Sequence, residues 1–265
     1  MQNHIQELLG GTHHTFLQGS YRNGTAISDI NDVDIVAVRL TTFSSVHTNK
    51  VLDTRIAWEE IFSEIERKLR GQNLYQWTVE RGDKCIRVRG AFDADVVPAV
   101  QIHDNHLVDP IAVYSFRTGT EKVNRPRLHY ANGVAKNDST LGRYKPTVRL
   151  FKNWKENHFP DDNVTTSSFK VESLVHGSAD ENFSDDYPAN FVLVGEDILG
   201  RLTARTLTPS VTSVCGGENI IENWQPVAQQ NFISQLTESV AHARAAYRAA
   251  TIGEAERNWR LALGI

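Results

Sequence analysis

Two pairs of aspartates begin apolar, β-branched stretches in the first half of the chain: Asp32 with Asp34, and Asp93 with Asp95. Side chains alternate along a strand, so carboxylates two residues apart lie on the same face. Neighbouring anions repel each other unless a cation lies between them. An isolated pair would suit a turn residue and an exposed strand position. Three carboxylates from two strands would instead hold two divalent cations for in-line phosphoryl displacement, and Mg²⁺ prefers such oxygen ligands.

Gly19 and Ser20 precede the first aspartate pair and follow a short stretch typical of a strand. A glycine at that turn would let backbone N–H groups approach a phosphate, and the serine hydroxyl would add a donor. A Gly-Ser pair alone predicts only a turn. Combined with both aspartate pairs, it favours a phosphate-binding site.

The elements that must position these residues form a mixed α/β lobe over residues 1–115. Thr54–Arg70 has apolar residues near helical spacing and ends at Gly71, so it predicts a helix. β-branched and alternating runs predict five strands, at His14–Gln18, Val33–Arg39, Tyr75–Glu80, Cys85–Arg89 and Phe92–Val100.

Residues 116–265 are expected to form a mostly helical lobe. Pro146 is placed to open a helix that runs to about Asn157, and Ser168 is expected to cap a helix over Ser167–Leu174. Two further helices are predicted at Val227–Thr251 and Glu254–Leu263, separated at Gly253. The fold class is therefore α+β, with the active-site cleft expected between the two lobes.

Composition excludes a disordered chain, a collagen and a coiled coil. With 265 residues, 40% of them hydrophobic and 23% charged, the chain is globular and can bury a core without staples. Two cysteines are too few for a disulfide framework or a four-cysteine zinc site. We expect a cytoplasmic protein, since the polar start resembles no signal peptide and no apolar stretch reaches the ~18 residues of a membrane span.

The distribution of charge carries more information than its sum. The net charge of −4 argues against a general nucleic-acid-binding surface. Between Phe116 and Lys155, however, ten Lys or Arg residues stand against two acids. This basic segment suits a local anionic ligand, and a solvated charged face would explain the charge equally well.

Several stretches of the sequence resemble the motifs of a known family. Gly19-Ser20, Thr25 and the D-V-D-I run form the signature of the nucleotidyltransferase superfamily that includes DNA polymerase β. D-V-V-P-A at Asp95–Ala99 resembles the third-carboxylate strand of oligoadenylate synthetases and bacterial CD-NTases, which are relatives of cyclic GMP-AMP synthase. Three later stretches are also similar to the family: Val148–Lys155, Ser168–Leu174 and Ala255–Gly264.

The resemblance implies a polymerase β-like first lobe followed by a helical lobe like that of the oligoadenylate synthetases. It implies that Asp32, Asp34 and Asp95 are the catalytic, metal-binding triad, whereas Asp93 matches no position of the motif. The implied nucleotide-binding residues are Gly19, Ser20, Lys152, Ser168 and Phe169. Each of the last three has a plainer interpretation: a surface lysine on an amphipathic helix, a helix cap, and a core aromatic residue.

The implied activity is a Mg²⁺-dependent cyclic oligonucleotide synthase of bacterial antiphage (CBASS) signalling. Two Mg²⁺ ions, or Mn²⁺, would act on nucleoside triphosphates (ATP, GTP, UTP or CTP), and a downstream effector would sense the cyclic di- or trinucleotide. No membrane partner is expected. No nucleic-acid activator is expected either, because the sequence has no zinc-ribbon Cys/His cluster and no long basic helix.

Two other functions remain open from the sequence. A nucleotidyltransferase acting on a tRNA end, a protein side chain or a small molecule would need the same metals. A catalytically silent nucleotide-binding sensor would typically have lost a carboxylate, and all three are present here.

Overall fold

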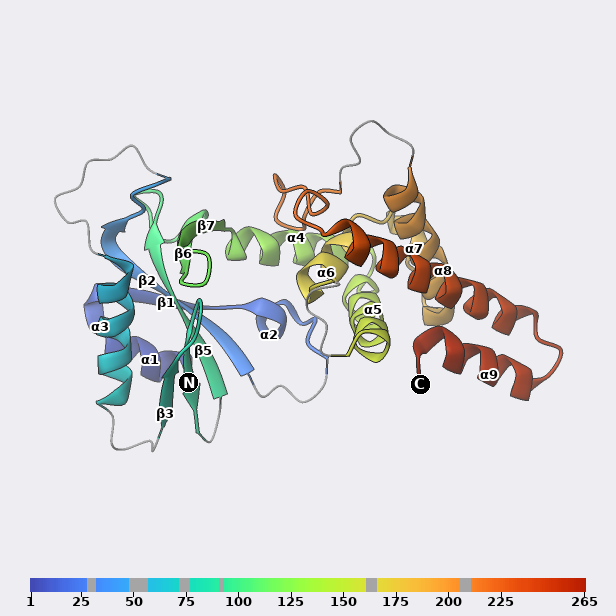
Figure 1. Cartoon of the computed structure of the whole chain (residues 1–265), viewed down its shortest axis with the longest axis horizontal. Coiled ribbons are helices and arrows are strands. Elements are labelled where there is room, and N and C mark those ends of the chain that lie inside the picture. Colours follow the sequence, from blue (N-terminus) through green and yellow to red (C-terminus); the bar gives the residue numbers. More distant parts are fainter. Residues whose placement is uncertain (28–31, 48–56, 72–76, 91–92, 161–165, 205–210) are drawn as a thin grey trace. The chain divides into compact units, whose positions relative to one another are not determined.

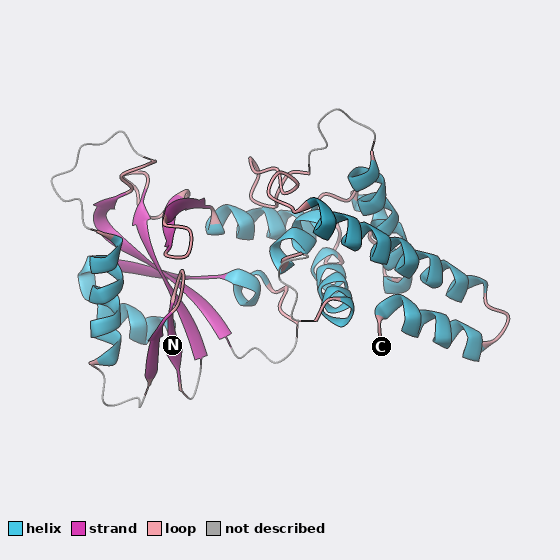
Figure 2. Ribbon diagram, in the orientation of Figure 1, coloured by secondary structure: helices cyan, strands magenta, loops and turns pink. Residues whose placement is uncertain are grey.

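The computed structural model describes residues 1–27, 32–47, 57–71, 77–90, 93–160, 166–204 and 211–265. The chain divides into two compact units, Met1–Tyr130 and Ala131–Ile265. Figures 1 and 2 show the strands of the sheet in the first unit and mainly helices in the second. The predicted α+β class, with a mixed-sheet lobe followed by a helical lobe, is confirmed.

A seven-stranded mixed sheet organises the first unit. Its main path has the order β1-β2-β5-β4-β3, and β6 pairs with both β5 and β7. β2 and β5 are parallel, and the other pairs are antiparallel. The strands are β1 (His13–Gln18), β2 (Asp32–Phe43), β3 (Thr78–Arg81), β4 (Ile86–Arg89), β5 (Asp93–Gln101), β6 (Ile111–Ser115) and β7 (Thr120–Asn124).

The two faces of this sheet have different surroundings. Ile35, Val96 and Ile86 lie on one face, in a buried cluster with residues of α1 (Gln2–Leu9) and α3 (Trp58–Arg70). Val36 and Val97 lie on the opposite face, in a smaller cluster. Because side chains alternate, positions 34 and 95 share the face of Val36 and Val97. The aspartates are therefore directed away from α1 and α3.

Helix α3 packs its apolar side on the apolar face of the sheet. Ile61, Ile65 and Leu69 recur at helical spacing and are buried against the sheet. Glutamates occupy its first turn and basic residues its last turn, which complements the helix dipole. The predicted helix is confirmed from Trp58 onward, and residues 54–56 lie outside the described part.

The second unit consists mainly of helices. The first of these, α4, begins in the first unit and ends in the second. Trp154 lies fully buried in its core and donates a hydrogen bond to Ser239 at 2.9 Å. The helices are α4 (Pro126–Ser139), α5 (Tyr144–His158), α6 (Ser168–His176), α7 (Tyr187–Thr203), α8 (Pro226–Arg248) and α9 (Ile252–Leu263).

Several boundaries differ from those predicted. The units separate after Tyr130, whereas the predicted boundary of 115/116 falls inside the β6–β7 hairpin. Gly19 and Ser20 begin the short helix α2 (Gly19–Asn23) rather than forming a simple turn. Gly253 lies inside the first turn of α9, and the chain leaves helical geometry before it, at Ala249.

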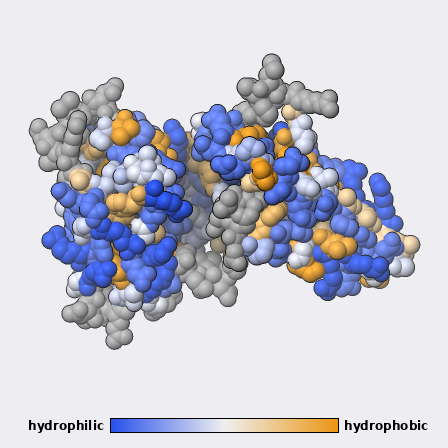
Figure 3. Space-filling model, viewed as in Figure 1, coloured by the Kyte–Doolittle hydropathy of each residue, from blue (hydrophilic) through white to orange (hydrophobic). Residues whose placement is uncertain are grey.

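On the side of the molecule drawn in Figure 3, hydrophilic side chains predominate and apolar ones are scattered among them. Within the described ranges, no helix combines the length and the apolar composition that crossing a bilayer requires.

Candidate active site

The aspartate pairs meet across the parallel strands β2 and β5. Asp34 lies directly opposite Asp95, and Asp32 lies opposite Asp93. The same row continues to Gln18 of β1 and Arg87 of β4, the residues opposite Asp34 and Asp95. The register of the sheet thus brings together two of the three predicted triad residues. The third, Asp32, is placed by its backbone only.

Asp95 is held from two sides. Arg89 Nη1 lies 3.1 Å from its Oδ1, and the Cys85 thiol donates to Oδ2 at 3.4 Å. Oδ1 is buried and accepts no hydrogen bond from the residues that the structure describes, since the arginine contact lacks hydrogen-bond geometry. Burial, reinforced by the Asp95 charge, raises the pKa of Cys85 to about 12. The thiol therefore keeps its proton and remains a donor.

Asp93 contacts the end of β4 and the residue that follows it. Its Oδ1 accepts the backbone N–H of Gly90 at 3.2 Å, and Arg89 Nε lies 3.5 Å from its Oδ2. These contacts fasten the end of β4 to the start of β5. Asp93 and Asp95 thus share one face of a strand but have different surroundings.

Gly19 lies against the Asp34 carboxylate. Its φ is +74°, and a Cβ built on it would overlap Oδ2 of Asp34. A side chain at this position would therefore be strained twice, by the backbone conformation and by the carboxylate. Ser20 is exposed at the start of α2. The helix ends at Gly24, where Thr25 N–H donates to the Ser20 carbonyl at 3.0 Å.

The donor set fits a divalent cation such as Mg²⁺. Asp34 and Asp95 offer carboxylate oxygens from neighbouring strands, and Oδ1 of Asp95 is a buried acceptor without a donor. In the part of the chain that the structure describes, no three His, Cys, Asp or Glu side chains are grouped to hold a metal ion. The Asp32 side chain, the third predicted ligand, lies outside that part.

Lys152 lies inside the second unit, on α5. It is 3% exposed, and its Nζ lies 2.6 Å from Oε2 of Glu172 on α6. Arg149, about one turn earlier on α5, is exposed. Lys152 is therefore not a surface lysine, and Glu172 is the anion that holds it.

Ser167, not Ser168, caps α6. The Ser167 hydroxyl accepts the backbone N–H of Lys170 at 3.3 Å. Ser168 is the first residue of the helix, with its side chain half-buried. The hydroxyl of Ser168 is thus not committed to the cap. Phe169 is half-buried and packs on the helical core, so its predicted role as a base platform stays a prediction.

Sequence reasoning missed Glu172, Cys85 and Arg89 as neighbours of the predicted residues. Glu172 stands in the same S-F-K-V-E motif as Ser168, so the signal was present. The contacts of Cys85 and Arg89 with Asp95 follow from the register of β4 against β5. The roles of the predicted residues, and the cleft expected between the lobes, remain predictions.

A known family model matches most of the second unit. Residues 131–243 match the family model of the cGAS/DncV-like nucleotidyltransferase C-terminal helical domain. Their first residue is also the first residue of the second unit.

Similar proteins cover both units. The cyclic nucleotide synthase CdnE01 of Staphylococcus haemolyticus is 30% identical over 253 residues, 83% of this chain and 82% of that protein. The cyclic UMP-AMP synthase of Rhodothermus marinus is 30% identical over 69% of each chain. The structure of Elizabethkingia meningoseptica CdnE cyclic dinucleotide synthase with GTP and Apcpp superposes with a TM-score of 0.70. This superposition has 27% identity and covers 88% of this chain and 89% of that one.

Proposed function

The chain belongs to the CD-NTase family of cGAS/DncV-like nucleotidyltransferases, and from that membership we propose that it joins nucleoside triphosphates into a cyclic oligonucleotide and releases pyrophosphate. The observation that carries the proposal is the register of Asp34 against Asp95 on parallel strands. This register places the two aspartates side by side on neighbouring strands, which supports a phosphoryl-transfer site. The proposed product is a cyclic di- or trinucleotide.

We propose that Asp32, Asp34 and Asp95 hold two Mg²⁺ ions, or Mn²⁺. When bound, such ions supply the charge that neutralises a triphosphate and lowers the pKa of the attacking hydroxyl. Asp95 would orient the acceptor ribose hydroxyl toward the α-phosphorus. The hydroxyl oxygen bonds to phosphorus as the bond to the β-phosphate breaks, and pyrophosphate leaves. Repeating this step with the intermediate's own hydroxyl closes the ring.

Other residues of the chain would position the triphosphate. Gly19 leaves room for the Asp34 carboxylate, and the exposed Ser20 would offer a hydroxyl to a phosphate. Lys152 and Ser168 would contact the β and γ phosphates, and Phe169 would stack on a base. Their contribution is mainly positioning, which lowers the barrier by removing motional freedom in advance.

We further propose that the product acts in bacterial antiphage defence, in the cytoplasm, where a downstream effector binds it. Relatives are named for products with different bases, among them UMP with AMP, two pyrimidines, two purines and three AMP units. The test must therefore offer all four nucleotides.

The experiment incubates the purified chain with four labelled ribonucleoside triphosphates and Mg²⁺ or Mn²⁺, followed by phosphatase and chromatography. A phosphatase-resistant product is expected. Asp34→Asn and Asp95→Asn should abolish it, since each change removes charge but keeps shape. Asp93→Asn is the matched control on the same strand and should retain most of the product.

Other outcomes would redirect the proposal. A phosphatase-labile ladder would indicate linear oligomers. Pyrophosphate release that appears only when a tRNA, protein or small-molecule acceptor is added would indicate the other transferase function. Nucleotide binding without turnover under every condition would indicate a silent sensor. Full product from Asp95→Asn would refute the assignment of the carboxylates.

A further inference from the structure

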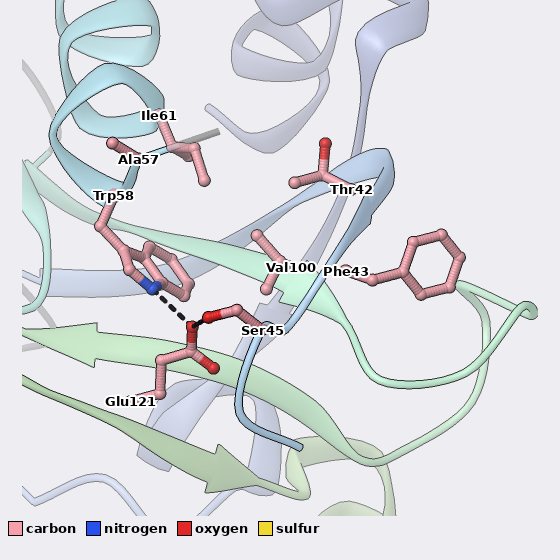
Figure 4. Close-up of a pocket in the computed structure, with 8 residues that line it drawn as sticks. All are labelled: Thr42, Phe43, Ser45, Ala57, Trp58, Ile61, Val100 and Glu121. Atoms are coloured by element: carbon pink, nitrogen blue, oxygen red, sulfur yellow. Dashed lines mark hydrogen bonds between the residues drawn. The ribbon is translucent and has the colours of Figure 1, made fainter. Parts of the chain in front are cut away.

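A cavity lies in the first unit, at the end of β2 that is far from the aspartates. Its volume is about 330 Å³. Figure 4 shows Trp58 from α3 and Glu121 from β7 meeting at one side of it. Val100 at the cavity lies five positions after Asp95 on β5, which at ~3.3 Å per residue is about 17 Å along the strand. The cavity is therefore distinct from the candidate active site.

Glu121 supplies the charge of this cavity. Its Oε1 accepts the indole N–H of Trp58 at 2.8 Å and the hydroxyl of Ser45 at 3.5 Å (Figure 4). Its Oε2 accepts the hydroxyl of Ser44. A carboxylate has about four acceptor positions, so the three neutral donors among the described residues leave one position, on Oε2, for a further donor.

No cation compensates this charge among the residues that the structure describes. Among these residues the hydrogen-bond partners of Glu121 are the neutral donors Ser44, Ser45 and Trp58, and no lysine, arginine or histidine pairs with it. A partly enclosed anion without a counter-ion favours a positively charged ligand.

The remaining lining sets the shape of that ligand. Ile61 and Val100 are almost fully buried and give the cavity an apolar floor, and Trp58 adds an aromatic wall. An aromatic ring beside a carboxylate suits a cation, and an apolar floor suits an alkyl chain. A guanidinium fork needs two acceptor positions on one edge of a carboxylate, whereas an ammonium group can use the single position left.

We propose that this cavity binds an alkylammonium group, with the ammonium on Glu121 and the alkyl chain along Trp58, Ile61 and Val100. The group is carried either by a lysine side chain of a partner protein or by a free aliphatic diamine. Both present the same chemistry to the site. The inference does not depend on the proposed synthase activity.

The test follows the indole N–H resonance of Trp58 in ¹⁵N-labelled protein, assigned with Trp58→Phe. The probes are N-acetyl-lysine methylamide, 1,5-diaminopentane and the uncharged N-acetyl-norleucine methylamide. Because this N–H donates to Glu121, a cation on that carboxylate should move the resonance. A saturable shift is expected with both charged probes and none with the norleucine analogue. Tighter binding of the blocked lysine would indicate a protein partner, and tighter binding of the diamine a free one.

Matched variants make the test specific. Glu121→Gln should weaken binding of the charged probes by about tenfold or more, the usual contribution of a hydrogen bond to a charged group. Glu60, in the first turn of α3, is exposed and outside the lining, so Glu60→Gln changes the net charge equally and should retain binding. The other indole resonances report whether each variant is folded.

A second variant covers the case in which Glu121→Gln does not fold. Ser45 is exposed at the rim, so Ser45→Lys would tether an ammonium group beside Glu121 and should prevent binding of the free probes. The proposal is overturned if neither charged probe gives a saturable shift. It is also overturned if the norleucine analogue binds as tightly, or if folded Glu121→Gln or Ser45→Lys binds like the parent.

Discussion

Replacing Glu172 by Gln removes the negative charge of an ion pair inside the helical unit. Both side chains of the pair are 4% exposed, and the Lys152 Nζ to Glu172 Oε2 distance is 2.6 Å. With an effective dielectric constant of about 20, two unit charges at this distance attract by about 6 kcal/mol. Burying each ion costs several kcal/mol. Because attraction and burial nearly cancel, the intact pair adds little to the free energy of unfolding.

Breaking the pair has a much larger effect than the pair's net contribution. Glu172→Gln leaves the lysine charge buried without its anion, which should lower the free energy of unfolding by about 3–5 kcal/mol. Lys152→Met should cost a similar amount, since it strands the carboxylate. The double variant Lys152→Met/Glu172→Leu removes both charges and keeps the volume. Its stability should lie within about 1 kcal/mol of the parent.

Urea unfolding, followed by circular dichroism, measures these differences, and the double variant then separates stability from catalysis. If Lys152 contacts triphosphate, the stable double variant should lose about tenfold to a hundredfold in kcat/KM, the contribution of one charge-assisted hydrogen bond. Parental turnover by the double variant would refute the phosphate role. A loss below about 1 kcal/mol for Glu172→Gln would refute the buried pair.

Three further predictions concern other parts of the chain. Gly19→Ala should abolish turnover and cost about 1–2 kcal/mol of stability, because it forces a side chain into left-handed backbone and onto the Asp34 carboxylate; product assays and urea unfolding check it, and unchanged turnover would contradict the placement of Asp34. Burial lowers the pKa of His13 from 6.5 to about 4, so as pH falls from 6.5 to 4 the unfolded chain takes up a proton that the folded chain does not. The free energy of unfolding should then fall by about 3 kcal/mol, and His13→Gln should flatten that slope in urea unfolding at several pH values. Ser167→Ala should destabilise the protein by about 1 kcal/mol through loss of the α6 cap, whereas Ser168→Ala should change thermal stability little; equal losses would contradict the capping assignment.

The part of the fold predicted from sequence is the part that hydrophobic periodicity determines. The run from Val33 to Arg39 is β-branched and lies at the centre of the sheet, and α3 has a clear apolar stripe. The β6–β7 hairpin was missed because Thr120–Asn124 is a mostly exposed edge strand with no alternating apolar pattern. That hairpin is also the reason why the predicted boundary at 115/116 fell too early.

The candidate site was likewise predicted only in part from the sequence. Two-residue spacing was enough to predict that Asp93 and Asp95 share one face of their strand, because strand geometry alone determines it, whereas the register of β2 against β5 brings Asp34 opposite Asp95. The S-F-K-V-E motif contains Glu172, but its contact with Lys152 could not be predicted, since the two residues lie twenty positions apart on different helices. The cap of α6 was assigned one residue too late because both Ser167 and Ser168 satisfy the preference for serine.

The carboxylates and the core of the first unit depend on one register. Asp34 and Asp95 are followed directly by Ile35 and Val96, which are fully buried on the opposite face against α1 and α3. A slip of one residue in β2 or β5 would turn an aspartate into the core and an apolar side chain toward solvent. Burying an unpaired carboxylate costs far more than the slip could recover. The hydrophobic effect that folds the sheet thus also keeps Asp34 opposite Asp95, so the site needs no contact between the aspartates themselves to hold its geometry.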